Sequence, residues 1–264
     1  MTENTMPAEK DLAPAVTRSV RIIEFLAGAS GPATLTDIAR AIGAAKSSTK
    51  NLCSVLADNE LIDRTEAGFT LGPRLLEFGG AYLRRFDELK AFYRFCADSP
   101  VLSHEIVQVA MLDGVHVVYL ARHEGSAPLR LTANIGDRFP ASSTAVGNAL
   151  LSALPPAEVE RRYANDPVFP QRTERSITSL PELQKALEAV REHGYAYDGG
   201  GVHPGVVGLA VTVTPRTAGG TALAVGASLV TPELSDQDRR KVVGELKNLA
   251  SLLSNPLVEA AHDS

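Results

Sequence analysis

The sequence predicts an α+β protein with an N-terminal winged helix-turn-helix, a linker helix and a C-terminal domain built around an antiparallel sheet. Three observations predict it. Three helical patterns and a hairpin signal fall within residues 16–71. Strand-like runs first dominate after about residue 105. Helical patterns recur between those runs, and two strand-like runs lie next to each other near the end of the chain. Strands with interspersed helices favour an α+β domain around an antiparallel sheet.

The N-terminal segment contains three successive helical patterns. Apolar residues recur at helical spacing in residues 16–27. Thr34 is placed to cap a second helix that runs to Ile42, with Asp37 in its first turn as a capping box prefers. A third helix is expected over residues 46–59, directly after the break at Gly43.

A short hairpin follows the third helix. Residues 61–64 and 69–71 are strand-like, and the turn between them ends in Gly68, where a positive φ is useful. Three helices followed by a hairpin in about 60 residues is typical of a winged helix-turn-helix.

The third helix has two unlike sides when its residues are placed at 100° per step. One side carries basic, hydroxyl and amide groups, and the other, which includes Ser48 and Thr49, is mostly apolar and small. A recognition helix needs this division, because one side packs on the domain while the other reaches phosphates and base edges. A solvated face of an ordinary helix is the alternative, and the flanking turn and hairpin favour DNA binding. The polar side consists of Lys46, Ser47, Lys50, Asn51 and Ser54.

The rest of the chain is expected to form these elements. Helical patterns cover residues 72–86, 89–96, 144–154, 156–163 and 180–193, and a last helix capped by Ser235 runs to about residue 253. Strands are expected at residues 106–111, 115–121, 129–135, 195–198, 206–214 and 222–230, the first two joined at Asp113-Gly114.

These patterns predict five segments. Residues 1–14 form a disordered tail, 15–72 the DNA-binding domain, 73–86 the linker helix, 87–256 a C-terminal α+β domain, and 257–264 a second tail.

The net charge is −5 over 264 residues, which taken alone argues against a nucleic-acid partner. The charge is divided unevenly, however. Residues 16–85 carry nine basic and seven acidic side chains, so the acidic excess belongs to the rest of the chain. The charge of the whole molecule therefore does not exclude DNA binding by the N-terminal segment.

Two isolated cysteines and no secretory h-region predict a cytoplasmic protein. The most apolar stretch, residues 222–230, is too short to span a bilayer, so no membrane partner is expected.

Catalysis and metal binding are the main alternatives. Ser142, Ser143, Asp198 and His203 are residue types that hydrolases use, but no GxSxG motif is present. The histidines do not have metal-binding spacing. We expect no catalytic residues, no metal and no cofactor.

The motifs together resemble the IclR family of bacterial transcriptional regulators, over about residues 16–256. The N-terminal likeness lies in TLTDIARAIGAAKSSTKNL, LADNELIDR and GFTLGPRLLEFG. The C-terminal likeness lies in IGDRFPASSTAVGNALLSAL, GYAYDGGGVHPGVVGLAVTV and ALAVGASL. The resemblance implies a winged helix-turn-helix, a GAF-like domain for effector binding and oligomerisation over residues 87–256, and homodimers that commonly pair into homotetramers.

The resemblance also implies functional residues. DNA contacts are expected from the stretch Lys46, Ser47, Ser48, Thr49, Lys50 and Asn51, with Ser48 and Thr49 pointing more inward. Arg64 on the wing and Arg18, ahead of the first helix, are expected phosphate contacts, or else solvated surface charges. The expected effector pocket comprises Leu131, Phe139, Ala145, Val146, Asp198, Gly208, Gly226 and Ser228.

The chain departs from the family pattern at five glycines. Gly199, Gly200 and Gly201 stand where the family usually has Asp-Glu-Glu, Gly208 where many members have cysteine, and Gly226 where serine is common. We therefore expect a roomier, less polar pocket that suits an aromatic or longer organic acid, unless residues 199–201 only mark a mobile loop.

The predicted function is that of a sequence-specific regulator whose affinity for double-stranded operator DNA changes when a small organic-acid effector binds. The alternative is a DNA-binding oligomer whose C-terminal domain binds no ligand. The sequence leaves open whether the protein represses or activates.

Overall fold

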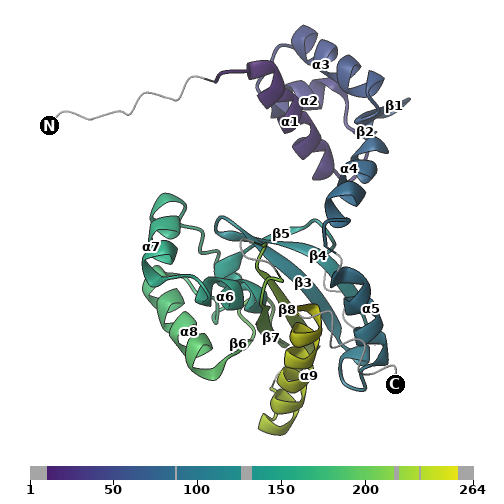
Figure 1. Ribbon diagram of the computed structural model, residues 1–264. Helices are drawn as coiled ribbons and strands as arrows, with labels where there is room; N and C mark the ends of the chain where they lie inside the picture. The colour runs from purple at the N-terminus through teal and green to yellow at the C-terminus, as the bar shows by residue number, and fades with distance from the viewer. Residues whose placement is uncertain (1–10, 87, 126–132, 217–219, 232, 255–264) are drawn as a thin grey trace, which may run out of the picture. The chain divides into compact units, whose positions relative to one another are not determined.

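The computed structural model describes residues 11–86, 88–125, 133–216, 220–231 and 233–254. The chain divides into two compact units, residues 1–85 and 86–264. The first contains helices and a small hairpin, and the second a larger sheet with helices on both faces (Figure 1). The predicted α+β fold class is confirmed.

The first unit is a helix-turn-helix with a wing. Its helices are α1 (Pro14–Ala27), α2 (Leu35–Ala41), α3 (Lys46–Asp58) and α4 (Arg74–Leu83), and its strands β1 (Ile62–Thr65) and β2 (Gly68–Leu71) are antiparallel. The capping box predicted at the start of α2 is confirmed: the Thr34 hydroxyl accepts from the Asp37 N–H at 3.2 Å, and Asp37 accepts from the Thr34 N–H.

The core of this unit gathers one apolar stripe from each of α1, α2 and α3. Ile22 and Leu26 of α1 meet Ile38 of α2, and Cys53 and Leu56 of α3 complete the cluster. All five side chains are nearly or fully buried, so α3 packs against the rest of the unit through one side only. The opposite side of α3 is left exposed.

The second unit is built on a six-stranded antiparallel sheet in the order β5-β4-β3-β8-β7-β6. Helix α6 packs on one face, together with α7 and α8, and α5 and α9 lie on the other (Figure 1). The strands are β3 (Ile106–Asp113), β4 (His116–Glu124), β5 (Arg138–Pro140), β6 (Ala196–Asp198), β7 (Val206–Val213) and β8 (Leu223–Val230). The helices are α5 (Glu88–Asp98), η1 (Leu102–His104), η2 (Ala141–Ser143), α6 (Ala145–Ser152), α7 (Pro156–Asn165), α8 (Leu180–His193) and α9 (Asp236–Ser254).

The predicted strand over residues 129–135 is wrong in the part that the structure describes. Residues 129–132 of the predicted strand 129–135 lie outside the described residues, and residues 133–135 are not in a strand. The edge strand β5 was missed instead. It has three residues, too few to show alternation, and pairing of Phe139 with Val117 of β4 defines it.

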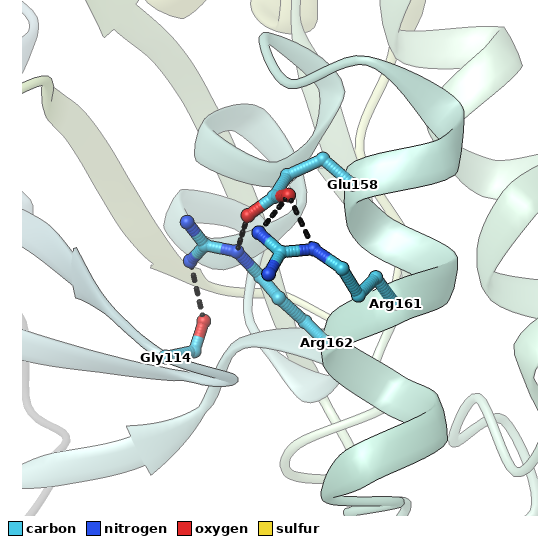
Figure 2. Close-up of polar contacts among 4 residues, drawn as sticks. All are labelled: Gly114, Glu158, Arg161 and Arg162. Carbon is cyan, nitrogen blue, oxygen red and sulfur yellow. Dashed lines mark hydrogen bonds and ion pairs between the residues drawn. The ribbon is translucent and has the colours of Figure 1, made fainter.

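Helix α7 is tied to the turn between β3 and β4 by a polar cluster (Figure 2). Arg162 donates to the backbone carbonyl of Gly114 at 2.9 Å and to Glu158 at 2.8 Å. Arg161 also donates to Glu158, its Nε lying 3.0 Å from Oε2. Hydrogen bonds from both arginines hold the pKa of the Glu158 carboxyl below its usual value. The carboxylate therefore stays charged and keeps both guanidinium groups in place.

Candidate nucleic-acid interface and ligand cavity

Helix α3 presents a polar, basic face to solvent. Five of its predicted contact residues are exposed, and no acidic residue lies in its first turn. Their types suit DNA: lysine reaches phosphates, and asparagine can pair with adenine in the major groove. The exposed residues are Lys46, Ser47, Ser48, Lys50 and Asn51.

Thr49 does not belong to that exposed face. It is fully buried, and its hydroxyl donates to the backbone carbonyl of Ala45 at 3.0 Å. Direct DNA contact by this side chain is therefore excluded as long as α3 stays packed. The inward orientation expected for Thr49 is thus confirmed, whereas that expected for Ser48 is wrong, since Ser48 is exposed. The reason is that the buried stripe of α3 is narrow, containing only Thr49, Cys53 and Leu56.

The two outlying arginines are both exposed. Arg64 lies on β1, opposite Phe69. Arg18 lies within α1 rather than ahead of it, because the helix begins at Pro14, a residue well suited to a first helical turn. Their contact with phosphates stays a prediction.

The second unit contains a cavity of about 150 Å³ between the sheet and α6. Every strand of the sheet contributes to its wall: Gln108 of β3, Tyr119 of β4, Phe139 of β5, Asp198 of β6, Leu209 of β7 and Ser228 of β8 are examples. Seven of the eight predicted effector residues line it, and the eighth, Leu131, lies outside the described residues. The seven are Phe139, Ala145, Val146, Asp198, Gly208, Gly226 and Ser228.

The first turn of α6 lies in the wall of this cavity. The Thr144 hydroxyl caps the helix by accepting from the Gly147 N–H at 3.1 Å. The N–H groups of Ala145 and Val146 donate no hydrogen bond to any described group, and both residues are buried in the cavity wall. Unpaired N–H groups at a helix N-terminus are suited to binding a carboxylate.

Asp198 is the one acidic residue in the described wall. Its Oδ1 accepts from the Gly201 N–H at 2.6 Å. Burial raises the pKa of the Asp198 carboxyl, and backbone N–H groups of the following loop oppose that rise. The group therefore lies closer to protonation than an exposed aspartate does.

The glycine loop after Asp198 is held at each of its three carbonyls. Arg175 donates to Gly199 at 2.8 Å, Thr173 to Gly200 at 2.9 Å and Ser176 to Gly201 at 2.7 Å. Ser176 is buried, so its bond is shielded from water. These three bonds favour a fixed loop over a merely mobile one.

The glycines permit close packing rather than leaving room. A Cβ at Gly226 would lie 2.6 Å from Val146 Cγ1, and one at Gly201 would lie 2.8 Å from Asp198 Oδ1. At Gly208 a Cβ would meet that of Ala145 at 3.2 Å. Neighbouring groups already occupy the space that a side chain would need, so the inference from glycine to a roomier pocket is wrong at these positions.

Sequence reasoning missed Arg172, Tyr119 and Gln108, which also line the cavity. Tyr119 and Gln108 lie in predicted strands, and the inward side of each strand could have been read from alternation. Arg172 comes from the irregular segment between α7 and α8, where no periodicity marks it.

Comparison with known proteins gives the family. Residues 81–255 match the domain described as "Bacterial transcriptional regulator IclR C-terminal", and residues 15–66 match the "IclR helix-turn-helix domain". The chain belongs to the IclR family. It is therefore a transcriptional regulator of the IclR type, in a family of regulators rather than enzymes.

Individual relatives span most of this IclR-family chain. The transcriptional repressor AllR of Escherichia coli K12 is 29% identical over 194 residues, which cover 73% of this chain and 71% of AllR. The crystal structure of the Agobacterium tumefaciens repressor BlcR is 29% identical with a TM-score of 0.58, covering 92% of this chain and 97% of that one. An IclR homologue from Microbacterium hydrocarbonoxydans, crystallised with 4-hydroxybenzoate, has a TM-score of 0.76 at 19% identity, covering 90% and 98%.

Neither a metal-binding cluster nor a membrane-spanning helix occurs among the described residues. They contain no group of three or more histidine, cysteine or acidic side chains placed to hold a metal ion. None of their helices is long and apolar enough to cross a membrane.

Proposed function

We propose that this protein is a repressor that binds double-stranded operator DNA through α3 and changes its operator affinity when a small organic acid enters the cavity. Repression is extended from AllR and BlcR, which are both repressors. Because its target is DNA, we place its action in the cytoplasm.

The exposed face of α3 supports the DNA half of the proposal. It combines two lysines with serine and asparagine side chains, and α3 is followed directly by the hairpin β1–β2. We assign residues 15–72 to DNA binding and 73–86 to the linker. A homodimer or homotetramer would present paired α3 helices, and the spacing between them would have to match the spacing of the operator half-sites.

The observation that carries the effector half is the cavity in residues 87–256. It combines two unpaired N–H groups of α6, at Ala145 and Val146, with apolar walls. Backbone N–H groups bind a carboxylate, and apolar walls strengthen those hydrogen bonds by excluding water.

The size of the cavity limits the effector to a small molecule. A dry protein cavity of ~150 Å³ holds one benzene molecule, and this one has about 150 Å³. Tyr119 and Phe139 pack edge to face in its wall, with ring centroids 5.7 Å apart. An acid with one aromatic ring, or an aliphatic acid of similar size, suits these dimensions. The Microbacterium homologue binds such an acid, but at 19% identity its likeness supports the fold alone.

The test uses the full-length chain and a labelled DNA fragment taken from upstream of its own gene. Fluorescence anisotropy measures the operator Kd with and without each of a panel of organic acids, and thermal unfolding identifies the acids that bind. We expect at least one acid both to raise Tm and to weaken operator binding. If specific DNA binding is found but no acid changes it or raises Tm, the C-terminal unit serves only in oligomerisation. If no specific DNA binding is found, the proposal fails.

A further inference from the structure

A short segment between α7 and α8 links two distant strands of the sheet at the cavity. We call residues 172–176 the bridging segment. Buried Ser176 organises it, accepting from the Arg172 N–H at 3.0 Å while donating to the Gly201 carbonyl at 2.7 Å. Thr173 adds a bond to Gly200. One end of the segment is thereby attached to the loop that follows β6, an edge strand.

The other end reaches the opposite edge of the sheet. The Arg172 guanidinium carbon lies 5.6 Å from the centre of the Phe139 ring on β5. Stacking on an aromatic face holds an arginine in position without neutralising its charge. Arg172 is exposed and lines the cavity, and no acidic side chain among the described residues pairs with it. Asp198, the carboxylate of the described wall, is bonded instead to Gly201.

The cavity thus has two places suited to an anion, supplied by different elements. The first is the pair of N–H groups at the start of α6, which lies next to Gly208 and Asp198. The second is Arg172 on Phe139, a residue of the other edge strand. A ligand with a single carboxylate satisfies only one of them.

We propose that the effector is a small dicarboxylic acid and that Arg172 is the residue that selects its second carboxylate. The first carboxylate binds the N–H groups of Ala145 and Val146, and the second takes the guanidinium in a two-bonded contact. This inference rests on the proposed function, since it specifies the class of acid that the cavity binds.

The acidic wall residue is compatible with a doubly charged ligand. Burial already raises the pKa of Asp198, so the approach of another anion favours uptake of a proton by this group. The hydrogen bond from Gly201 places Oδ1 toward the loop.

The test measures affinity for matched acids that differ by one carboxylate: benzoate against the three benzenedicarboxylates, and butanoate against succinate. Isothermal titration with the full-length protein should show at least one diacid binding about 10- to 100-fold tighter than its monoacid partner, as expected for a charge-assisted contact. Arg172→Gln should abolish that preference, and Arg172→Lys should retain part of it.

Arg161→Gln is the matched control, because Arg161 is exposed like Arg172 but does not line the cavity. It should keep the diacid preference. The ratio of diacid to monoacid affinity is informative because a merely structural defect would weaken both acids alike.

The outcomes separate this inference from the proposed function. If Arg172→Gln keeps the diacid preference, or if the unmodified protein binds monoacids as tightly as diacids, the inference is overturned. Release of operator DNA by monoacids alone would overturn it while leaving the proposed function intact. Selective diacid binding that leaves operator affinity unchanged would support the ligand class and contradict the proposed function.

Discussion

Single residues in this protein show how burial changes the role of a side chain. Asp198 and Thr49 are both polar, and each is satisfied by a nearby backbone group, Gly201 and Ala45 respectively. Asp198 lies in the wall of a cavity, where its charge state can respond to a ligand. Thr49 lies in a closed core, where its hydroxyl is used entirely within the helix. Although both side chains are polar, we therefore expect Asp198 to respond to a ligand and Thr49 to act only within its helix.

Asp198 makes the stability of the protein depend on pH. Burial raises its pKa in the folded chain above the ordinary value of about 3.9, so its contribution to stability is complete below that value and is lost as pH rises through the folded pKa. The Tm of the unmodified protein relative to Asp198→Asn should therefore increase as pH falls from 7 toward 4. Calorimetry at each pH measures this, and the other carboxyl groups cancel in the comparison. A constant Tm difference would contradict it.

Lys50 should contribute to DNA affinity without specifying sequence. Lys50→Ala removes an exposed charge from α3, so binding to all DNA sequences should weaken and the slope of log K against log salt should fall by about 1. Anisotropy titrations over a range of salt concentrations measure both effects. Lys247→Ala, an exposed lysine of α9, is the control and should change neither.

Thr49 should contribute nothing directly to DNA binding. Thr49→Val keeps the shape of a fully buried side chain and loses only the bond to Ala45, so operator affinity should stay within about two-fold. The same titrations measure this, with Tm recorded alongside. A loss like that of Lys50→Ala at unchanged Tm would show that Thr49 does reach DNA.

At the scale of elements, glycines determine how closely segments approach. In the wing, Gly68 has φ 142°, and a Cβ there would lie 2.4 Å from the Ala33 carbonyl oxygen. That oxygen accepts from the Phe69 N–H at 2.8 Å, so β2 is bonded to the segment before α2. In the second unit, Gly226 brings β8 against Val146 of α6 in the same way.

Gly68→Ala should destabilise the winged unit by about 1–3 kcal/mol, because it adds both a strained backbone and a steric conflict. Gly31→Ala is the control: nothing lies within 4 Å of a Cβ at that position, so its effect should be small. Thermal and chemical unfolding of the full chain compare the two. Equal stability of both variants would mean that the wing relaxes freely at Gly68.

Gly226 and Val146 should be energetically coupled. Gly226→Ala places a Cβ 2.6 Å from Val146 Cγ1, and overpacking of this kind typically costs about 1–3 kcal/mol. Val146→Ala removes the conflicting atom, so the double variant should lose less stability than the sum of the single variants. A double-mutant cycle of unfolding free energies measures the coupling. Simple additivity would show that α6 shifts away from β8 instead.

At the scale of the whole molecule, the proposed function requires the two units to influence each other. An effector can change operator affinity only by binding the competing states of the protein unequally, and the coupling is reciprocal. If an acid weakens operator binding by a given factor, saturating operator DNA must weaken binding of that acid by the same factor, typically 5- to 150-fold. Anisotropy and calorimetry measure the two factors. A large inequality between them would mean that the acid and the DNA compete directly at one site.

The sequence by itself determined the fold class and much of the candidate site. The capping box at Thr34, the helix stripes and the Asp113-Gly114 hairpin are local signals, so they predict elements without reference to distant residues. The resemblance to the family assigned Phe139, Ala145, Val146 and Asp198 to the effector pocket, because each of them lies within a recognisable sequence motif. All four lie in the wall of one cavity in the structure.

Only the tertiary structure decided the features that depend on distant contacts. The strand β5 exists because Phe139 pairs with Val117, and Thr49 is buried because α3 packs with a narrow stripe. Arg172 lines the cavity because Ser176 and Thr173 attach its segment to the glycine loop. The close approach at Gly226 depends on Val146, 80 residues earlier in the chain. Periodicity describes which side of an element is apolar, but packing between elements decides which polar groups are buried and which charges face a ligand.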